Sequence, residues 1–209
     1  MYADYDRIYK FNQEFVSQGE ARLVSSTPSS LIPTLIEEVP DVETGTLVYD
    51  VSIFTTMLID GGEGNQEESK FAYADENYFK VFDFELLSGN AVQVLAEPNQ
   101  IVLTKSTAER YFGNTGAASG KIIKVEGIDY TVSGVMEDFP SNSHMEFDFL
   151  ASFKSHRHGK DPEWSPSNYY TYVKLKSGTD VPAFEGKVEQ IKEKYLGKDL
   201  AEYGYKTSF

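Results

Sequence analysis

Three side chains capable of metal binding or acid–base chemistry lie at every second position of one short segment. In "PSNSHMEFDFLASF", which runs from Pro140 to Phe153, these residues are His144, Glu146 and Asp148. In an extended strand, side chains at i, i+2 and i+4 share one face, so the imidazole and both carboxylates would point the same way. The trio is therefore the first candidate for a metal site or an acid–base pair.

The geometry of a strand argues against that function. Alternate strand residues lie about 6.5–7 Å apart along the axis, whereas zinc ligands converge on one ion at about 2.0–2.2 Å. The opposite face of the segment, Met145, Phe147 and Phe149, is apolar throughout. This pattern is typical of a half-buried strand with its polar face in water. We therefore predict no metal, cofactor or catalytic role for the trio.

Two more histidines, His156 and His158, follow in "KSHRHGKDPEWSPSN". This stretch is polar and contains two prolines and a glycine, so we predict a linker in which both imidazoles are exposed. A zinc site would have to recruit His144 and an acid from elsewhere in the fold, which nothing in the spacing indicates.

An acidic stretch, "DGGEGNQEES", could be read as a calcium loop. Its candidate oxygen ligands are Asp60, Glu63, Asn65, Glu67 and Glu68. Their spacing does not match D-x-[DN]-x-[DN]-G, so we predict a solvated hairpin loop. The sequence also lacks a G-x-S-x-G elbow and a phosphate-binding P-loop. We therefore predict that the chain is not an enzyme and has no catalytic, cofactor or metal residues.

The first part of the chain alternates strands with one clear helix. "RIYKFNQEFV" predicts a strand with Tyr9, Phe11 and Gln13 on one face. "STPSSLIPTLIEEVP" predicts a helix with Thr27 or Ser30 as its N-cap. "GTLVYDVSIFTTMLID" and "ESKFAYAD" predict strands on either side of the acidic loop, and "DENYFKVFDFELLSG" predicts a short helix.

A second strand–helix unit begins at "NQIVLTKSTAERYFGNTG", where Ser106 and Glu109 have the spacing of a capping box and Gly113 fits the helix end. "GKIIKVEGIDYTVSGVMEDF" predicts a hairpin around a Glu-Gly turn. "YYTYVKLKSG" predicts a last strand, followed by a helix capped by Asp180. The apolar residues of that helix form one face: Phe184, Val188, Ile191 and Tyr195.

This order of elements predicts a discontinuous α+β domain. The closing strand and helix have no partner of their own and most simply pair with the first unit. We therefore expect residues 1–93 and 165–209 to form one domain, with residues 94–164 inserted as a β-rich second one.

Composition excludes several classes of protein. The chain has 209 residues, of which 40% are hydrophobic and 14% aromatic, enough for a packed core. Its 19 basic and 33 acidic residues give a net charge of −14, which opposes binding to nucleic acid or to an anionic membrane surface. There is no cysteine, and no segment is long and apolar enough to predict a transmembrane helix.

Three motifs in a fixed order resemble a known family. They are the "D-x-x-Y/F-F-x-V-F" helix with "L-x-x-G" in "FAYADENYFKVFDFELLSGN", the "A-x-x-Y-F-G" end of "NQIVLTKSTAERYFG", and "V-x-G-V" before Pro-Ser-Asn-Ser-His in "YTVSGVMEDFPSNSHMEFDFLASF". Over residues 5 to 195 the chain resembles the extracytoplasmic core domain of ABC transporter permeases of the MacB/FtsX type.

This resemblance implies a fold and a function. It implies a porter-like α+β subdomain with a β-rich, Sabre-like subdomain inserted in it, located in the periplasm. It also implies that the chain is an excised domain: permease helices precede and follow it, and the full transporter is a dimer with a cytoplasmic ATPase. Relatives of this type relay ATP-driven change to extracytoplasmic substrates or partner proteins, in export, lipoprotein release or signalling. The family gives the Pro-Ser-Asn-Ser-His turn no catalytic role, so we expect His144 to bond turn backbone groups.

Two other functions remain as alternatives, a secreted metal-dependent hydrolase and a small-ligand-binding domain. A bound metal at His144 would favour the first, and a concave apolar pocket would favour the second. From the charge of −14, we expect the isolated domain to be a monomer.

Overall fold

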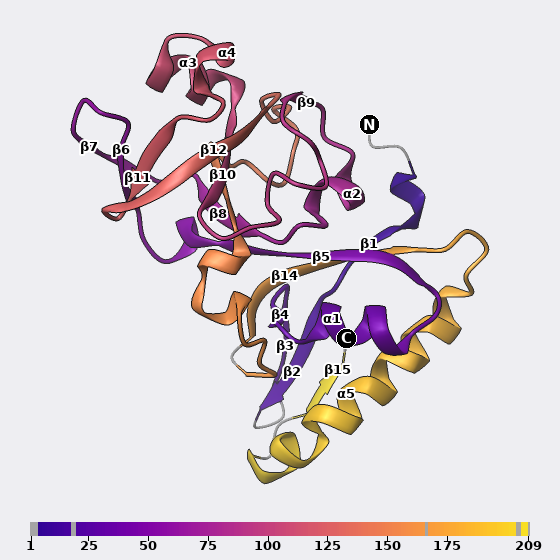
Figure 1. Cartoon of the computed structure of the whole chain (residues 1–209). Coiled ribbons are helices and arrows are strands. Elements are labelled where there is room, and N and C mark those ends of the chain that lie inside the picture. Colours follow the sequence, from indigo (N-terminus) through magenta and orange to yellow (C-terminus); the bar gives the residue numbers. More distant parts are fainter. Residues whose placement is uncertain (1–3, 18–19, 166, 204–205, 209) are drawn as a thin grey trace. The chain divides into compact units, whose positions relative to one another are not determined.

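The computed structural model describes residues 4–17, 20–165, 167–203 and 206–208, and they form two compact units (Figure 1). Unit 1 contains residues 3–47 and 161–209, and unit 2 contains residues 48–160. The chain is mixed α+β, as the sequence predicted.

The main strands of unit 1 have the order β1-β14-β5. Strand β1 (Ile8–Lys10) pairs antiparallel with β14 (Ser167–Leu175), and β4 (Thr27–Pro28) pairs with the start of β14. Strand β5 (Val42–Asp50) contributes its first part to this unit. A second, small antiparallel sheet has the order β15 (Lys206–Ser208), β2 (Gln13–Ser17), β3 (Glu20–Val24).

Two helices supply one side of the unit 1 core. Helix α1 (Leu31–Glu38) buries Leu31, Ile32 and Leu35, and Val39 after it is also buried. Helix α5 (Val181–Tyr203) buries three of the four residues of its predicted face, whereas Tyr195 is partly exposed and stacks on Trp164 with ring centroids 4.8 Å apart. These side chains pack with strand residues in one cluster that includes Phe11, Val42, Val173 and Leu175.

Helix α5 begins where its sequence indicated. The Asp180 carboxylate accepts a hydrogen bond from the backbone N–H of Ala183 at 3.1 Å, which satisfies one of the free donors of the first turn. Helix α1 begins after Ser30, one of the two predicted caps, but the Ser30 side chain makes no capping hydrogen bond.

Unit 2 contains a mixed sheet in the order β5-β8-β13-β10-β12-β11-β6-β7, in which only the last three residues of β5 belong to this unit. Strand β9 pairs with the end of β12. The pairs β8–β13 and β10–β12 are parallel and the other described pairs are antiparallel. The strands are β6 (Met57–Asp60), β7 (Asn65–Glu68), β8 (Phe71–Ala74), β9 (Leu86–Ser88), β10 (Gln100–Thr104), β11 (Ile122–Val125), β12 (Ile128–Met136) and β13 (Phe149–Ser152).

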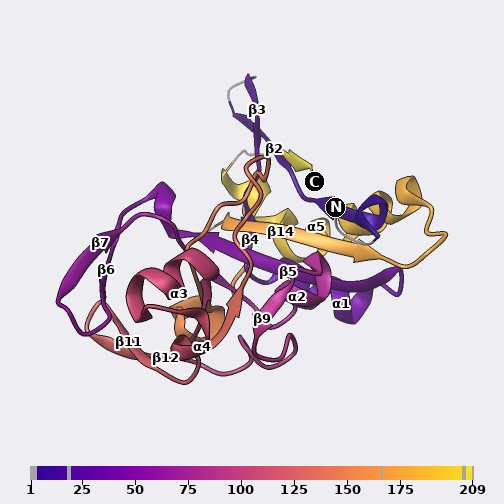
Figure 2. The same ribbon diagram turned by 90° about the horizontal axis from the view of Figure 1, so that it is seen from above.

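The helices of unit 2 are short. They are α2 (Tyr78–Phe82), α3 (Lys105–Phe112), α4 (Thr115–Ala118) and the 3-10 turns η2 (Val51–Ile53), η3 (Phe153–Ser155) and η4 (Arg157–Gly159). Helices α3 and α4 pack on β10 and β12, and β6 and β7 form a hairpin at one margin of the sheet (Figure 2). The core between them contains Ile101, Leu103, Ile123, Val132 and Phe149.

Local signals set the ends of several elements as predicted. Gly113 ends α3 in the left-handed region, with φ 79°. Glu126 and Gly127 have φ 50° and 78° and make the turn between β11 and β12. At the start of α3, however, Glu109 makes no capping box. Asp138 instead accepts from the backbone N–H of Ser106 at 3.0 Å and from its hydroxyl at 2.5 Å.

The first boundary between the units lies earlier than the sequence analysis placed it. Residues 48–93 pack with the insert, because β8 pairs with β13 and β6 pairs with β11. The second boundary, after Lys160, lies close to the expected one, and β14 and α5 return to the first unit. The arrangement is therefore an inserted unit within a discontinuous one, with an insert longer than expected.

Candidate functional site

The segment that carries the first candidate trio is not a strand over most of its length. Ladder pairing begins only at Phe149, so the strand expected from His144 onward was wrong. Burial still alternates: Met145 and Phe147 are buried, whereas His144 and Glu146 are exposed. The buried apolar side chains hold in place the extended segment that leads into β13, and the polar side chains point away from the core.

Both carboxylates of the trio are held by cations. Glu146 pairs with the ammonium of Lys70, and a carboxylate oxygen of Asp148 lies 3.6 Å from Nη2 of Arg110. Partial burial raises the pKa of Asp148 above its usual range. Since ion pairing occupies these oxygens, the carboxylates position β13 against α3 and the residues before β8.

The acidic hairpin divides into two parts with different contacts. At its tip, the Asp60 carboxylate accepts from the N–H groups of Gly62 and Gly64 at 2.7 and 3.1 Å and so shapes the turn. At its base, Glu68 is buried and pairs with Arg110. The Tyr111 hydroxyl donates to Glu68 at 2.7 Å. Glu63, Asn65 and Glu67 are exposed, but Asn65–Glu68 forms strand β7 and Glu68 is buried, so the solvated loop expected over the whole stretch was wrong beyond the tip.

His156 and His158 do not lie in an exposed linker, and this prediction was wrong. The imidazole of His156 lies among the rings of Tyr49, Tyr73 and Phe153, with centroids 4.8, 5.5 and 5.4 Å away. His158 is buried and its Nε2 accepts from Nε of Arg157 at 2.8 Å. Burial lowers the pKa of His156 to about 4, so the aromatic cluster contains a neutral ring near pH 7.

The described residues contain no group of three or more His, Cys, Asp or Glu side chains placed to hold one metal ion. A binding function would therefore have to use a pocket on the surface.

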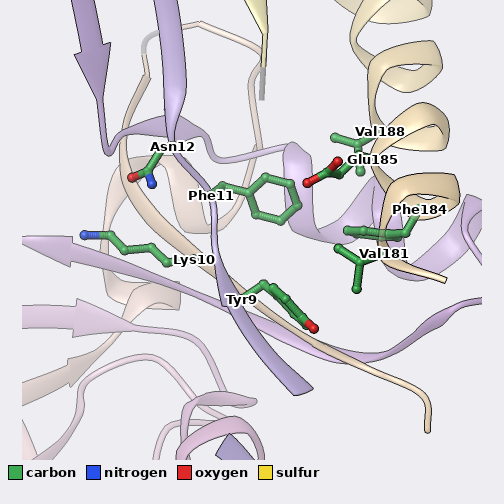
Figure 3. Close-up of a pocket in the computed structure, with 8 residues that line it drawn as sticks. All are labelled: Tyr9, Lys10, Phe11, Asn12, Val181, Phe184, Glu185 and Val188. Atoms are coloured by element: carbon green, nitrogen blue, oxygen red, sulfur yellow. The ribbon is translucent and has the colours of Figure 1, made fainter. Parts of the chain in front are cut away.

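A pocket of about 100 Å³ lies between β1 and the first turns of α5 (Figure 3). Its lining residues are Tyr9, Lys10, Phe11, Asn12, Val181, Phe184, Glu185 and Val188. Tyr9 and Phe11 point toward the helix, whereas Lys10 and Asn12 point the opposite way (Figure 3). The apolar wall therefore comes from one face of the strand and one face of the helix.

The sequence contained part of the signal for this pocket. It placed Tyr9 and Phe11 on one face of a strand, and Phe184 and Val188 on one face of a helix. It could not show that the two faces meet, because they are separated by more than 170 residues. The Phe11 and Phe184 rings lie 6.4 Å apart, centroid to centroid.

A more polar pocket of about 180 Å³ adjoins the first one and shares Tyr9 and Val181 with it. Its other lining residues are Asp6, Arg7, Leu175, Lys176, Gly178 and Thr179. Together the two pockets form a groove, here called the β1–α5 groove, with an apolar end and a polar end. It lies entirely within unit 1.

An ion-pair network fixes the entry to β1. The Arg7 guanidinium lies 2.8 Å from Asp4, donates to the Leu175 carbonyl at 2.8 Å and pairs with Glu43 at 2.5 Å. Lys174 lies 2.9 Å from the same Asp4 carboxylate. Hydrogen bonds from Lys174 and then Arg7 lower the pKa of Asp4. The network joins the turn before β1 to β14 and β5, so it holds one side of the groove in place.

Comparison with known proteins gives the family. The sequence matches the family described as the MacB-like periplasmic core domain over residues 3–191. A search of curated proteins by sequence found no match.

Three solved structures share the fold. A domain assigned to a permease protein from Porphyromonas gingivalis has a TM-score of 0.84 and 21% identity, over 100% of this chain and 90% of that one. The periplasmic region of MacB from Actinobacillus actinomycetemcomitans has a TM-score of 0.63 and 15% identity, over 94% and 87%. The extracellular domain of the noncanonic ABC-type transporter YknZ from Gram-positive bacteria has a TM-score of 0.62 and 15% identity, over 90% and 95%.

In the described part of the chain, no helix has the length and apolar character needed to cross a membrane. The family match covers nearly the whole chain, and the α+β fold agrees with it. The protein therefore belongs to the MacB-like periplasmic core domain family and is the periplasmic domain of an inner-membrane ABC transporter permease.

Proposed function

We propose that this domain relays conformational change from a cytoplasmic ATPase, through the permease helices, to substrates or partner proteins in the periplasm. The observation that carries the proposal is the family match over residues 3–191. The order of the units along the chain supports the proposal. Unit 2 is inserted in unit 1, so both of its chain connections lead to unit 1. Movement of unit 1 would therefore act on unit 2 through two chain crossings.

A role without catalysis fits the contacts of the candidate residues. The carboxylates of Glu68, Glu146 and Asp148 are paired with basic side chains, and the imidazole of His156 lies among aromatic rings. The two pockets of the β1–α5 groove, of about 100 and 180 Å³, are each also smaller than the roughly 300–1,000 Å³ of sites that enclose small molecules. These features favour a mechanical or docking function over a metal-dependent hydrolase or a small-ligand binder.

The relay can be tested by distance measurements in the full permease with its ATPase. This domain has no cysteine, so Glu63→Cys and Glu193→Cys, made in a permease and ATPase freed of any other cysteine, place one spin label on an exposed site of each unit. We expect the distance distribution between the labels to change between the nucleotide-free and the vanadate-trapped transporter. The same labels in the isolated domain are the control and should not respond to nucleotide. Identical distributions in every nucleotide state of the transporter would refute the relay.

A further inference from the structure

The β1–α5 groove lies beside an open edge of the unit 1 sheet. Strand β1 is the last strand of the order β1-β14-β5, so it has one neighbour in the described part of that sheet. Phe11 donates its backbone N–H to the Thr171 carbonyl at 3.0 Å, and Tyr9 lies opposite Val173. In an antiparallel pair, hydrogen-bonded residues alternate with residues whose groups point outward. The N–H and C=O of Lys10 therefore point away from β14, at the edge.

The side chain of Lys10 is held away from this edge. Its ammonium lies 4.3 Å from the centroid of the Tyr170 ring and 5.9 Å from that of Tyr172. Both tyrosines lie on the sheet face opposite the buried Val173, and Lys10 points away from α5 (Figure 3). The backbone donor and acceptor of Lys10 thus stand beside a pocket that its own side chain does not fill.

From this placement we propose that the edge of β1 and the β1–α5 groove bind an extended segment of a partner polypeptide by strand addition. A segment paired with β1 forms backbone hydrogen bonds with Lys10, which gives sequence-independent affinity. Residues of the segment opposite Tyr9 and Phe11 lie on the same face as those rings and so point toward α5. Two residues of the segment, separated by one, therefore face the groove.

The groove specifies the chemistry of that segment. The apolar end of the groove is lined by the buried side chains of Phe11, Phe184 and Val188. The pocket at this end has a volume of about 100 Å³, which suits one side chain. The lining of the two pockets carries both charges, acidic at Asp6 and Glu185 and basic at Lys10, Arg7 and Lys176, whereas the chain as a whole carries a net charge of −14. A segment with apolar residues at alternate positions complements the apolar end of the groove, and an excess of Lys or Arg complements the net charge of the domain.

A display library of random heptapeptides, selected on the isolated domain, tests the proposal. We expect enriched sequences to be basic, with apolar residues at alternate positions. A synthetic peptide of an enriched sequence should lose at least tenfold in affinity to Lys10→Pro, because proline removes the edge N–H, and an edge strand tolerates proline there. Lys10→Ala keeps the N–H and is the matched control, with affinity within about twofold of wild type.

Two further measurements separate docking from a folding defect. Val181→Trp should fill the mouth of the pocket and weaken binding at least tenfold without touching the ladder. The same peptide, N-methylated at the residue opposite Lys10, should also lose at least tenfold on the wild-type domain. Failure to enrich any sequence, or equal binding to wild type and Lys10→Pro, would overturn the proposal. A dimer of the domain that Lys10→Pro dissolves would instead identify a second copy as the occupant, which also overturns it.

Discussion

At the scale of single residues, the carboxylates and histidines that first suggested chemistry are engaged in ion pairs and ring contacts. The alternation of Met145 and Phe147 with His144 and Glu146 was read correctly from the sequence, because burial alternation needs only a local extended chain. The strand itself was misjudged, because a ladder also needs a partner, and β13 finds β8 and β10 far away in the sequence. For the same reason no local pattern could show that Arg110 meets Glu68.

The Arg110–Glu68 pair gives the first prediction. Replacing Arg110 with alanine leaves the buried Glu68 carboxylate with Tyr111 as its remaining side-chain donor. Leaving a buried charge without its partner is costly, so we expect a loss of about 2 kcal/mol in the free energy of unfolding, reduced from the fully buried case because Arg110 is partly exposed. Urea denaturation of the purified domain measures it.

Lys70→Ala is the matched control for this variant. Lys70 and Glu146 form an ion pair in which both side chains are exposed, so its loss should cost under about 0.5 kcal/mol. Equal destabilisation by Arg110→Ala and Lys70→Ala would show that burial of Glu68 does not decide the cost.

His156 gives a prediction about pH. Its pKa in the folded chain is about 4, below the ordinary value of 6.5, because burial among Tyr49, Tyr73 and Phe153 disfavours the charged ring, as do His158 and Arg157 beside it. Between these two pKa values the unfolded chain binds a proton that the folded chain does not. The free energy of unfolding therefore falls as pH drops through this window.

A comparison with His156→Phe isolates this contribution from all other titrating groups. From pH 7 to pH 5, we expect wild type to lose about 1 kcal/mol more stability than the variant, a value reduced for the partial exposure of the ring. Urea denaturation at the two pH values provides the measurement. Parallel losses in the two proteins would mean that His156 is protonated in the folded chain at pH 5.

At the scale of elements, two motif glycines of the family resemblance lie against each other. Gly89 ends "L-x-x-G" after β9, and Gly134 is the glycine of "V-x-G-V" in β12. A Cβ on Gly134 would lie 2.9 Å from the Ser88 carbonyl oxygen, and one on Gly89 would lie 2.7 Å from the Ser133 carbonyl oxygen. The sequence shows the two motifs. It does not show that both glycines are required for one reason, the close approach of two backbone segments.

Gly134→Ala should therefore destabilise the domain by about 2–3 kcal/mol, since the contacted oxygen belongs to backbone that cannot turn aside. Gly116→Ala in α4 is the matched control. A Cβ on Gly116 would lie 3.5 Å from its nearest neighbour, Oδ1 of Asn114. Because alanine is favoured over glycine in a helix, this variant should raise the free energy of unfolding by up to about 1 kcal/mol. Thermal or urea unfolding of both variants gives the comparison. A stable Gly134→Ala protein would mean that β9 shifts freely against β12.

At the scale of the whole molecule, sequence and structure agree on a discontinuous α+β chain and differ on where the insert begins. The end of the insert was visible because "YYTYVKLKSG" and the helix after it form a separate strand–helix pair. Its beginning was not, since β6 and β8 find their partners β11 and β13 more than 60 residues later. Strand pairing across such separations leaves no local signal in the sequence. The order of the family motifs can be read without knowing which strands pair.

The net charge leads to the last prediction, that the isolated domain is a monomer at micromolar concentration. Two copies that each carry −14 repel one another, most strongly at low salt where screening is weak. A stable interface buries about 1,200–2,000 Å², and the contacts must outweigh that repulsion. Size exclusion with light scattering should give a mass near 23.5 kDa at both low and high salt. A mass of twice that value, persisting on dilution, would contradict the prediction and show that two copies of the domain bind each other directly in spite of their charge.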